Sequence, residues 1–239
     1  MTTDTHEIPV TDDEAVTATV HHGPSDRWFV CCHGFLSDRT GSYESRCERA
    51  VEAGYSAVRF DFRGCGDADG AFVDQTLSDK LADLEAVVDR VDPDSYVLFG
   101  SSFGGKVAFH AAPTDDRVEA VVARAPVTDN RSFDEYREAV REDGECRFED
   151  GRRIDRRFFD DLDRYPFDDV AAALAVPVAI VHGRDDESVP LGDSTDATAA
   201  LETDVLLEAV AGEGHRFSRE GERRMRERVF DWLGCVRER

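Results

Sequence analysis

Six short apolar runs, separated by longer stretches with an amphipathic pattern, constrain the fold of this 239-residue chain more than any other feature. The runs are rich in valine and aromatic residues and end near Gly, Pro or Ser, which is typical of buried strands. They occupy residues 28–35, 55–62, 96–101, 118–126, 176–183 and 204–210. Near-continuous apolar strands are typical of a parallel sheet covered on both faces, and their alternation with helices predicts an α/β fold.

The stretches between the apolar runs supply the covering helices. Residues 42–54, 76–91 and 218–236 have helical periodicity, and in 76–91 leucines and valines recur on one face. Residues 14–22 alternate between apolar and polar side chains more regularly, so they could form an antiparallel edge strand.

One segment interrupts the strand–helix alternation. Residues 127–170 separate two predicted strands by more chain than a simple crossover needs. Within them, residues 146–154 resemble a hairpin around Asp150-Gly151, and residues 156–165 resemble a short helix. We therefore interpret the chain as one domain, residues 1–239, with an inserted cap at about 127–170.

The acidic charge of the chain argues against nucleic acid as a partner and indicates that the protein works in high salt. The chain has 52 acidic and 29 basic residues, for a formal net charge of −23, and only Lys80 and Lys106 among the basic residues are lysines. Acid dispersed along a folded chain causes self-repulsion that molar salt would screen, which predicts a protein from a halophile. A merely acidic mesophilic enzyme is the alternative. Nucleic acid is not an expected partner, because binding it needs a basic surface.

The lengths of the apolar segments and the pattern of the cysteines indicate in which cellular compartment the protein is expected. No run approaches the length of a membrane-spanning helix, and the acidic N-terminal stretch lacks the apolar region of a secretory signal, so no membrane association and a cytoplasmic location are expected. The six cysteines form no C-x-x-C pair and no Cys/His spacing typical of zinc, so no metal site is predicted. We interpret Cys31 and Cys32, which are adjacent in an apolar run, as small core residues kept reduced in the cytoplasm.

The motif "GSSFG" at residues 100–104 supplies the first candidate for chemistry. It matches G-x-S-x-G with Ser102 at the centre, and it lies between a predicted strand and a predicted helix. A serine on such a turn is exposed at the edge of the sheet, beside the N–H groups and positive dipole end of the helix. Ser102 is therefore the candidate nucleophile.

A serine nucleophile needs a general base and an acid that orients the base. Of seven histidines, His215 lies in the Gly-rich stretch "AGEGHRF" between the last predicted strand and the last helix, at the sheet edge where active-site groups gather. The stretch "HGRDDESVP" directly after the strand at 176–183 offers Asp185, Asp186 and Glu187 as the acid.

At this point the chain resembles the α/β-hydrolase family, and the resemblance covers about residues 28–233. Members often carry H-G-x-x-D-x-x-V-P after the seventh strand, and the aspartate of that motif falls on Asp186. The order Ser102, Asp186, His215 matches the family order of the catalytic triad. The resemblance implies an oxyanion hole formed by the backbone N–H groups of Phe35, in "HGF", and Phe103.

Two further features of the sequence indicate which branch of the α/β-hydrolase family the chain resembles. "FDFRGCGDADGAF" (60–72) resembles the D-x-R-G-x-G-x-S-x-G stretch of small esterases, although Ala68 replaces the usual serine. With the cap, this stretch is similar to the feruloyl-esterase and acyl-peptidase-like branch. The cap aromatics Phe148, Phe158 and Phe159 could line an acyl pocket or form the core of the cap itself.

The implied function is a carboxylesterase-like serine hydrolase that cleaves an acyl bond of a small molecule without metal or organic cofactor. An acyl peptidase or a thioesterase would use the same triad, and a non-catalytic binding protein with this fold is a further alternative. The sequence leaves the oligomeric state open between monomer and dimer.

Overall fold

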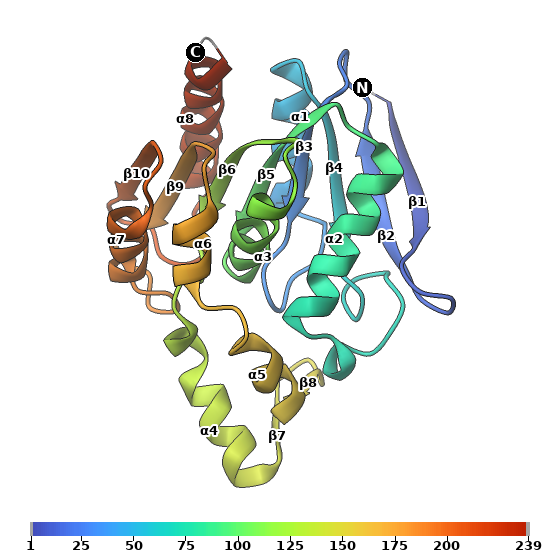
Figure 1. Ribbon diagram of the computed structural model, residues 1–239, viewed down its shortest axis with the longest axis vertical. Helices are drawn as coiled ribbons and strands as arrows, with labels where there is room; N and C mark the ends of the chain where they lie inside the picture. The colour runs from blue at the N-terminus through green and yellow to red at the C-terminus, as the bar shows by residue number, and fades with distance from the viewer. Residues whose placement is uncertain (1, 238–239) are drawn as a thin grey trace.

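The computed structural model describes residues 2–237, and a twisted sheet forms its centre (Figure 1). The strands are, in chain order, β1 (Thr3–Pro9), β2 (Ala15–His21), β3 (Arg27–Cys32), β4 (Ser56–Asp61), β5 (Ser95–Ser101), β6 (Val118–Arg124), β7 (Glu145–Arg147), β8 (Arg153–Asp155), β9 (Val178–Gly183) and β10 (Val205–Val210). Eight of them form one sheet in the order β1-β2-β4-β3-β5-β6-β9-β10. Neighbours from β4 to β10 pair in parallel, so the predicted α/β architecture with a mostly parallel sheet is confirmed.

The helices cover both faces of this sheet. They are α1 (Ser42–Glu52), α2 (Leu77–Val91), α3 (Phe103–Ala111), α4 (Asp134–Asp143), α5 (Arg156–Leu162), α6 (Phe167–Ala173), α7 (Leu191–Ala200) and α8 (Arg219–Arg237), with short 3₁₀ turns η1 (Phe72–Asp74), η2 (Ala112–Thr114) and η3 (Asn130–Phe133). Helices α1 and α8 pack on one face, and α2 and α3 pack on the other (Figure 1). Each predicted strand lies within three residues of an observed one, because the apolar runs are the segments buried between these layers.

The strand predicted at residues 14–22 is β2, and it pairs antiparallel with β4 as expected. It is not the edge of the sheet, because β1 pairs with its outer side. Strand β1 is exposed along most of its length, and Ile8 is its buried side chain. An edge strand with one buried residue carries no apolar alternation, so the sequence pattern did not reveal it.

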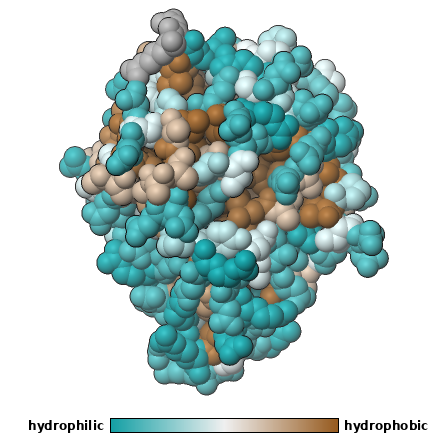
Figure 2. Space-filling model, viewed as in Figure 1, coloured by the Kyte–Doolittle hydropathy of each residue, from teal (hydrophilic) through white to brown (hydrophobic). Residues whose placement is uncertain are grey.

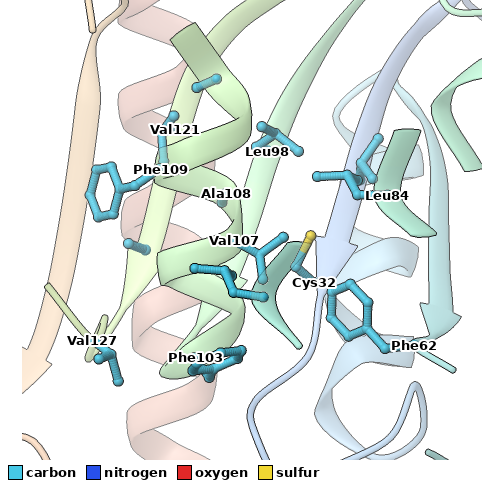
Figure 3. Packing of buried hydrophobic residues seen from close by; sticks show 14 of the residues in the cluster. Cys32, Phe62, Leu84, Leu98, Phe103, Val107, Ala108, Phe109, Val121 and Val127 are labelled. Carbon is cyan, nitrogen blue, oxygen red and sulfur yellow. The ribbon is translucent and has the colours of Figure 1, made fainter. Parts of the chain in front are cut away.

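Helix α3 is held against the middle of the sheet by its apolar face. Val107, Ala108 and Phe109 are fully buried, and Figure 3 shows Val107 beside Leu98 of β5 and Cys32 of β3. Side chains in such a core interdigitate closely and leave little freedom to the backbone that carries them. Because α3 begins directly after Ser102, this packing also determines where that serine lies.

Residues 127–170, the predicted cap, lie beyond the carboxyl edge of the sheet (Figure 1). The predicted hairpin is present as β7 and β8, whose turn is closed by a hydrogen bond from Gly151 N to Phe148 O of 3.0 Å. The predicted short helix is α5. Helix α4 was not predicted, because most of its residues are charged and its apolar face is narrow, with Val140 buried and Tyr136 half-buried.

Two contacts tie the end of the cap to the helices below it. Lys106 of α3 donates from Nζ to the carbonyl oxygen of Tyr165 at 2.8 Å, and its own side chain is buried. On α2, the N–H and hydroxyl of Ser78 donate to the carboxylate of Asp161 at 2.9 and 2.6 Å. Hydrogen bonds to charged partners are stronger than neutral ones, so these contacts stabilise the position of the cap.

The surface is dominated by polar and charged side chains. On the face shown in Figure 2 the hydrophilic colour prevails, and hydrophobic side chains form smaller patches between charged ones. Across residues 2–237, the structure contains no helix whose length and hydropathy would let it cross a bilayer.

A half-buried histidine makes the folded protein sensitive to acid. Burial and the nearby charge of Lys106 lower the pKa of His110 from 6.5 to about 3. Between these pH values His110 is therefore protonated in the unfolded chain but not in the folded chain. The free energy of unfolding consequently falls as the pH drops from 6.5 towards 3. We expect His110→Leu to reduce the pH dependence of the unfolding free energy by up to one proton in this window, measured by urea unfolding at a series of pH values.

Val107→Ala is the matched control, since it alters the same helix without removing a titrating group. Its unfolding free energy must keep the pH slope of the wild type. An unchanged slope in His110→Leu would contradict the assignment.

Candidate active site

Ser102 lies on a sharp turn between β5 and α3, as the motif predicts. Its backbone has φ +53° and ψ −117°, a conformation that is strained for any residue other than glycine. The flanking glycines are required by close approach: a β-carbon at Gly100 would lie 2.3 Å from Gly104 O, and one at Gly104 would lie 2.2 Å from Cys32 O. The turn therefore packs the first turn of α3 closely against β3 and projects Ser102 above the sheet edge.

The structure brings together the three residues that the sequence proposed as a triad. The hydroxyl of Ser102 lies 3.1 Å from His215 Nε2, and His215 Nδ1 lies 2.8 Å from Asp186 Oδ2. The two contacts join segments separated by 113 and 29 residues along the chain. Both distances are within hydrogen-bond reach, which is the geometry that lets a histidine take a proton from serine while a carboxylate orients it.

Asp186 is the carboxylate that contacts His215, whereas Asp185 is exposed. The side chain of Asp186 is fully buried, and its Oδ1 accepts hydrogen bonds of 2.9 Å from the N–H groups of Ser188 and Val189. Burial alone would raise the pKa of Asp186, but hydrogen bonds from His182, His215 and Val189 hold it well below its ordinary value. The group is therefore a carboxylate across the whole pH range in which enzymes work.

A second histidine lies behind Asp186. The Nε2–H of His182 donates to Val189 O at 2.9 Å and lies 3.2 Å from Asp186 Oδ2, while its Nδ1 accepts from the hydroxyl of Ser194 at 2.7 Å. These partners determine the tautomer of the ring. Oδ2 of Asp186 thus faces the two imidazoles while Oδ1 accepts from backbone N–H groups, which restricts rotation of the carboxylate.

A third histidine supports the loop predicted to hold the oxyanion. His33 is buried, its Nδ1–H donates to Gly34 O at 2.8 Å, and its Nε2 accepts from Phe62 N at 3.1 Å. Burial, together with the charge of Lys80, lowers the pKa of His33 to about 3, so the ring is neutral as this pairing requires.

This arrangement orients the Gly34–Phe35 peptide. The peptide is trans, so with its carbonyl turned to His33 the N–H of Phe35 points to the opposite side. Gly34 lies against Ser102, since a β-carbon built on it would be 3.6 Å from Ser102 Cβ. The N–H of Phe103 is one of the first N–H groups of α3, which have no partner within the helix.

An aromatic cluster, here called the Phe35 cluster, surrounds the ring of Phe35. Its other members have ring centroids 5.1–6.5 Å from that of Phe35 and are Phe72, Phe103, Phe133, Tyr136, Phe148 and Phe158. The cluster places side chains of the cap over the residue that follows Gly34. One of its members, Phe103, directly follows Ser102 in the chain.

The three aromatics predicted for an acyl pocket do not occupy equivalent positions. Phe148 is partly exposed, whereas Phe158 is 2% exposed and Phe159 is 3% exposed. Phe159 lies outside the Phe35 cluster, with its ring against Phe158 at 5.2 Å and under the guanidinium of Arg137 at 4.7 Å. Burial of Phe158 and Phe159 makes them part of the cap core, and a role in substrate binding stays a prediction for all three.

Sequence reasoning assigned no role to His33 or His182. Both precede a glycine at the end of a buried strand, and this repeated His-Gly pair is the signal that could have identified them. Among the described residues, no group of three or more His, Cys, Asp or Glu side chains is arranged to hold a metal ion.

Comparison with curated proteins gives partial matches to a quorum-quenching protein and to thioesterases. The chain is 33% identical over 112 residues to the quorum-quenching protein AidA of Acinetobacter baumannii, which is 43% of this chain and 36% of that protein. It is 25% identical over 213 residues to the mitochondrial palmitoyl-protein thioesterase ABHD10 of Mus musculus, covering 82% of this chain and 68% of that protein. The chain thus spans only about a third of the length of AidA.

Comparison with solved structures confirms the fold. Est1E from Butyrivibrio proteoclasticus, in a structure with bound ferulic acid, has a TM-score of 0.85 to this chain, with 22% identity over 98% of this chain and all of the other. The similarity covers the sheet, the covering helices and the cap alike. The predicted α/β-hydrolase fold is therefore correct.

The family match includes every residue of the serine–histidine–aspartate arrangement. The model of the prolyl oligopeptidase family matches residues 42–236, most of the chain. This match shows that the chain belongs to the prolyl oligopeptidase family, and the similarity to Est1E shows that its fold is that of the α/β-hydrolases.

Proposed function

We propose that this protein is a serine hydrolase that cleaves a carboxylic ester or thioester of a small molecule through an acyl-enzyme intermediate. The observation that carries the proposal is the hydrogen-bonded series Ser102–His215–Asp186 at the carboxyl edge of the sheet. A non-catalytic binding protein would have no reason to keep all three groups in this geometry together with a strained nucleophile turn.

Acylation begins when Ser102 Oγ attacks the carbonyl carbon of the substrate and its proton passes to His215 Nε2. Asp186 stabilises the imidazolium that forms and keeps Nδ1–H directed towards itself. The N–H groups of Phe35 and Phe103 would hold the negative charge on the carbonyl oxygen. The tetrahedral intermediate then collapses, and the alcohol or thiol leaves with the proton from His215.

Deacylation repeats the same steps with water as the nucleophile. His215 takes a proton from water as the oxygen attacks the acyl carbon, and the proton returns to Ser102 Oγ as the ester bond to the enzyme breaks. The products are a carboxylic acid and the regenerated serine. The residues of this chain supply every proton transfer in the cycle.

The acyl group that the site would accept is apolar. The Phe35 cluster lies beside the residue whose N–H would bind the carbonyl oxygen, so an aromatic or aliphatic acyl chain could contact the rings of Phe35 and Phe148. Burial of apolar surface would contribute about 25 cal/mol per Å² to binding. Of the cap aromatics, Phe148 is the one we propose to contact the acyl group, because it is partly exposed.

Thioester cleavage is the second candidate, and the similarity to the thioesterase ABHD10 over 82% of this chain favours it. Ester and thioester cleavage differ in the leaving group, so matched substrates separate them. Turnover of p-nitrophenyl butyrate and of butyryl-coenzyme A, compared as kcat/KM, decides which class the site prefers.

A fluorophosphonate reagent tests the proposal itself. We expect a covalent adduct on the peptide that contains Ser102, located by mass spectrometry, together with turnover of at least one of the two acyl reporters. Absence of both the adduct and turnover in molar KCl would contradict the proposed function.

We also propose that the protein works in high salt. Both of its lysines are buried, so the exposed basic side chains of residues 2–237 are arginines and histidines, set among 52 acidic residues in the chain. Screening of this charge should raise the midpoint of thermal unfolding steeply between low and molar KCl. For a chain of this size each 1 kcal/mol shifts the midpoint by about 2–4 °C, so several kcal/mol would give about 10 °C.

Calorimetry over a KCl series measures this shift, and a sucrose series of equal osmolality is the control. A midpoint that stays flat in KCl, or that rises equally in sucrose, would remove the argument for charge screening. Neither result would affect the assignment of the nucleophile.

A further inference from the structure

Arg124 lies at a central position of the sheet edge that carries the triad. It is the last residue of β6, which lies between β5, the strand before Ser102, and β9, the strand before Asp186 (Figure 1). Side chains alternate along a strand, so Arg124 faces the same side as Val122 and Ala120, which pack in the core under α1 and α8. A basic side chain thus enters an apolar layer.

The backbone of Arg124 holds the nucleophile. The N–H of Ser102 donates to Arg124 O at 2.9 Å, which joins the strained turn to β6. The hydrogen bond satisfies a donor that the turn would otherwise leave without a partner in the sheet.

The side chain of Arg124 holds the histidine. Its Nη1 donates to the backbone carbonyl oxygen of His215, its Nε donates to Ser101 Oγ at 3.3 Å, and its guanidinium lies 5.5 Å from the ring centroid of Phe217. A guanidinium offers several donors in a rigid planar fork, so one group can bind the residue before the nucleophile and the loop of the base together. This is the contact that ties the His215 loop to the strand beside Ser102.

A buried arginine needs compensation for its charge, and helices α1 and α8 supply it. Glu222 of α8 lies 4.0 Å from Arg124 Nε, and both of its carboxylate oxygens accept from Arg46 Nη2 at 2.7 Å. Arg46 in turn lies 4.7 Å from the ring centroids of Tyr43 and Phe99. The cluster Arg124–Glu222–Arg46 has one carboxylate for two guanidinium groups.

Burying the charged cluster Arg124–Glu222–Arg46 is not expected to increase the free energy of unfolding. Taking charged groups out of water carries a penalty that mutual attraction often fails to recover, and apolar side chains of similar volume would fill the same space. The contacts made by Arg124 are directed at Ser101 and His215 rather than at the core. The direction of its donors therefore accounts for its presence better than packing does.

We propose that Arg124 is a positioning residue for the hydrolytic reaction, and that it holds His215 at the distance from Ser102 that proton transfer requires. This inference rests on the proposed function of Ser102 and His215. Loss of the guanidinium would free the histidine loop while leaving Ser102, Asp186 and the substrate surface in place. Misplacement of a catalytic group by about 1 Å can cost about 10²-fold in rate.

The test uses Arg124→Gln and Arg124→Lys in the full-length protein. We expect Arg124→Gln to lower kcat by about 10²-fold with KM changed by less than about threefold, because positioning affects the reaction step rather than binding. Arg124→Lys keeps the charge but offers a point donor, and it should recover part of the loss. An Arg124→Gln variant with wild-type kcat overturns the proposal.

A proton NMR spectrum supplies a measurement that does not depend on turnover. The proton shared between His215 Nδ1 and Asp186 should give a downfield resonance in the wild type, and Arg124→Gln should shift or lose it. If the resonance is unchanged in the variant, the positioning role is wrong even where kcat falls. If the wild type hydrolyses no acyl reporter but the resonance responds to Arg124→Gln, Arg124 does hold His215 in place, and it is the proposed function that fails.

Arg63→Gln is the matched control for the loss of a buried arginine. Arg63 donates to the carboxylates of Asp83 at 2.5 Å and Glu14 at 3.0 Å, and its described contacts do not include His215. This variant should unfold at a lower temperature yet keep its kcat and its downfield resonance. Equal losses of kcat in Arg63→Gln and Arg124→Gln would show a general effect of destabilisation and overturn the proposal.

Discussion

Ser102→Ala is expected to lower kcat for an activated ester such as p-nitrophenyl acetate by about 10⁵- to 10⁶-fold, as loss of the nucleophile does in comparable triads. The hydroxyl is the only group of the turn that lies within hydrogen-bond reach of His215 Nε2, at 3.1 Å, so nothing in its immediate surroundings can replace it as nucleophile. The rate that remains would come from polarisation of the carbonyl and from substrate binding. Steady-state kinetics in molar KCl measure the change.

The neighbouring serine of the same motif is a suitable control. Ser101 is buried and its hydroxyl accepts from the Arg124 guanidinium, so Ser101→Ala loses one hydrogen bond to a charged group, worth about 1.5–3 kcal/mol, or at most about 10²-fold in rate. If Ser101→Ala and Ser102→Ala were equally impaired, the loss would reflect disruption of the turn. If Ser102→Ala kept near-normal activity, the nucleophile would have to be another residue.

The parts of the fold that apolar burial determines could be predicted from the sequence. Strands such as β5 and β9 are buried on both faces, and their composition alone marks them. Strand β1 and helix α4 have almost no buried side chains, so tertiary pairing rather than local pattern maintains them. Their positions therefore could not be derived from periodicity.

In the candidate site, too, residues marked by a local sequence pattern could be predicted, whereas a residue defined by long-range contacts could not. Ser102 is marked by a local motif, and Asp186 and His215 are marked by their places after particular strands. Arg124 has no such mark: its contact with His215 spans 91 residues and depends on the strand order, which places β6 between β5 and β9. A charged residue inside an apolar run is the one sequence signal that it carries.

Two buried histidines, His33 and His182, support the candidate site for a physical reason that the sequence pattern does not indicate. A neutral imidazole can donate from one nitrogen and accept at the other, so it can bridge two groups in a low-dielectric interior without carrying charge. His33 bridges Gly34 O and Phe62 N in this way, and His182 bridges Val189 O and Ser194 Oγ. One histidine thus supports the loop expected to bind the oxyanion, and the other supports the acid.

The two adjacent aspartates provide the second large test. Asp186→Asn is expected to lower kcat by about 10⁴-fold, because the amide would favour the tautomer of His215 that cannot accept the proton of Ser102. The amide nitrogen would also face the Nε2–H of His182, since Nε2 already donates to Val189 O and lies 3.2 Å from Asp186 Oδ2. Two donors in contact cost stability, so the variant should also unfold at a lower temperature.

Asp185→Asn is the matched control, because the same chemical change is made one residue away on an exposed side chain. The contact that Asp185 makes through its backbone, from its N–H to Glu213 O at 3.0 Å, is unaffected by the substitution. Its kcat should stay within about threefold of the wild type, as surface substitutions change energies by about 0.5 kcal/mol or less. Because hydrogen bonds hold the pKa of Asp186 well below its usual range, titration of Asp186 itself should add no pH dependence to the loss measured in an activity profile. A large loss in Asp185→Asn with little change in Asp186→Asn would move the acid by one residue and would require a different orientation of His215 from the one described.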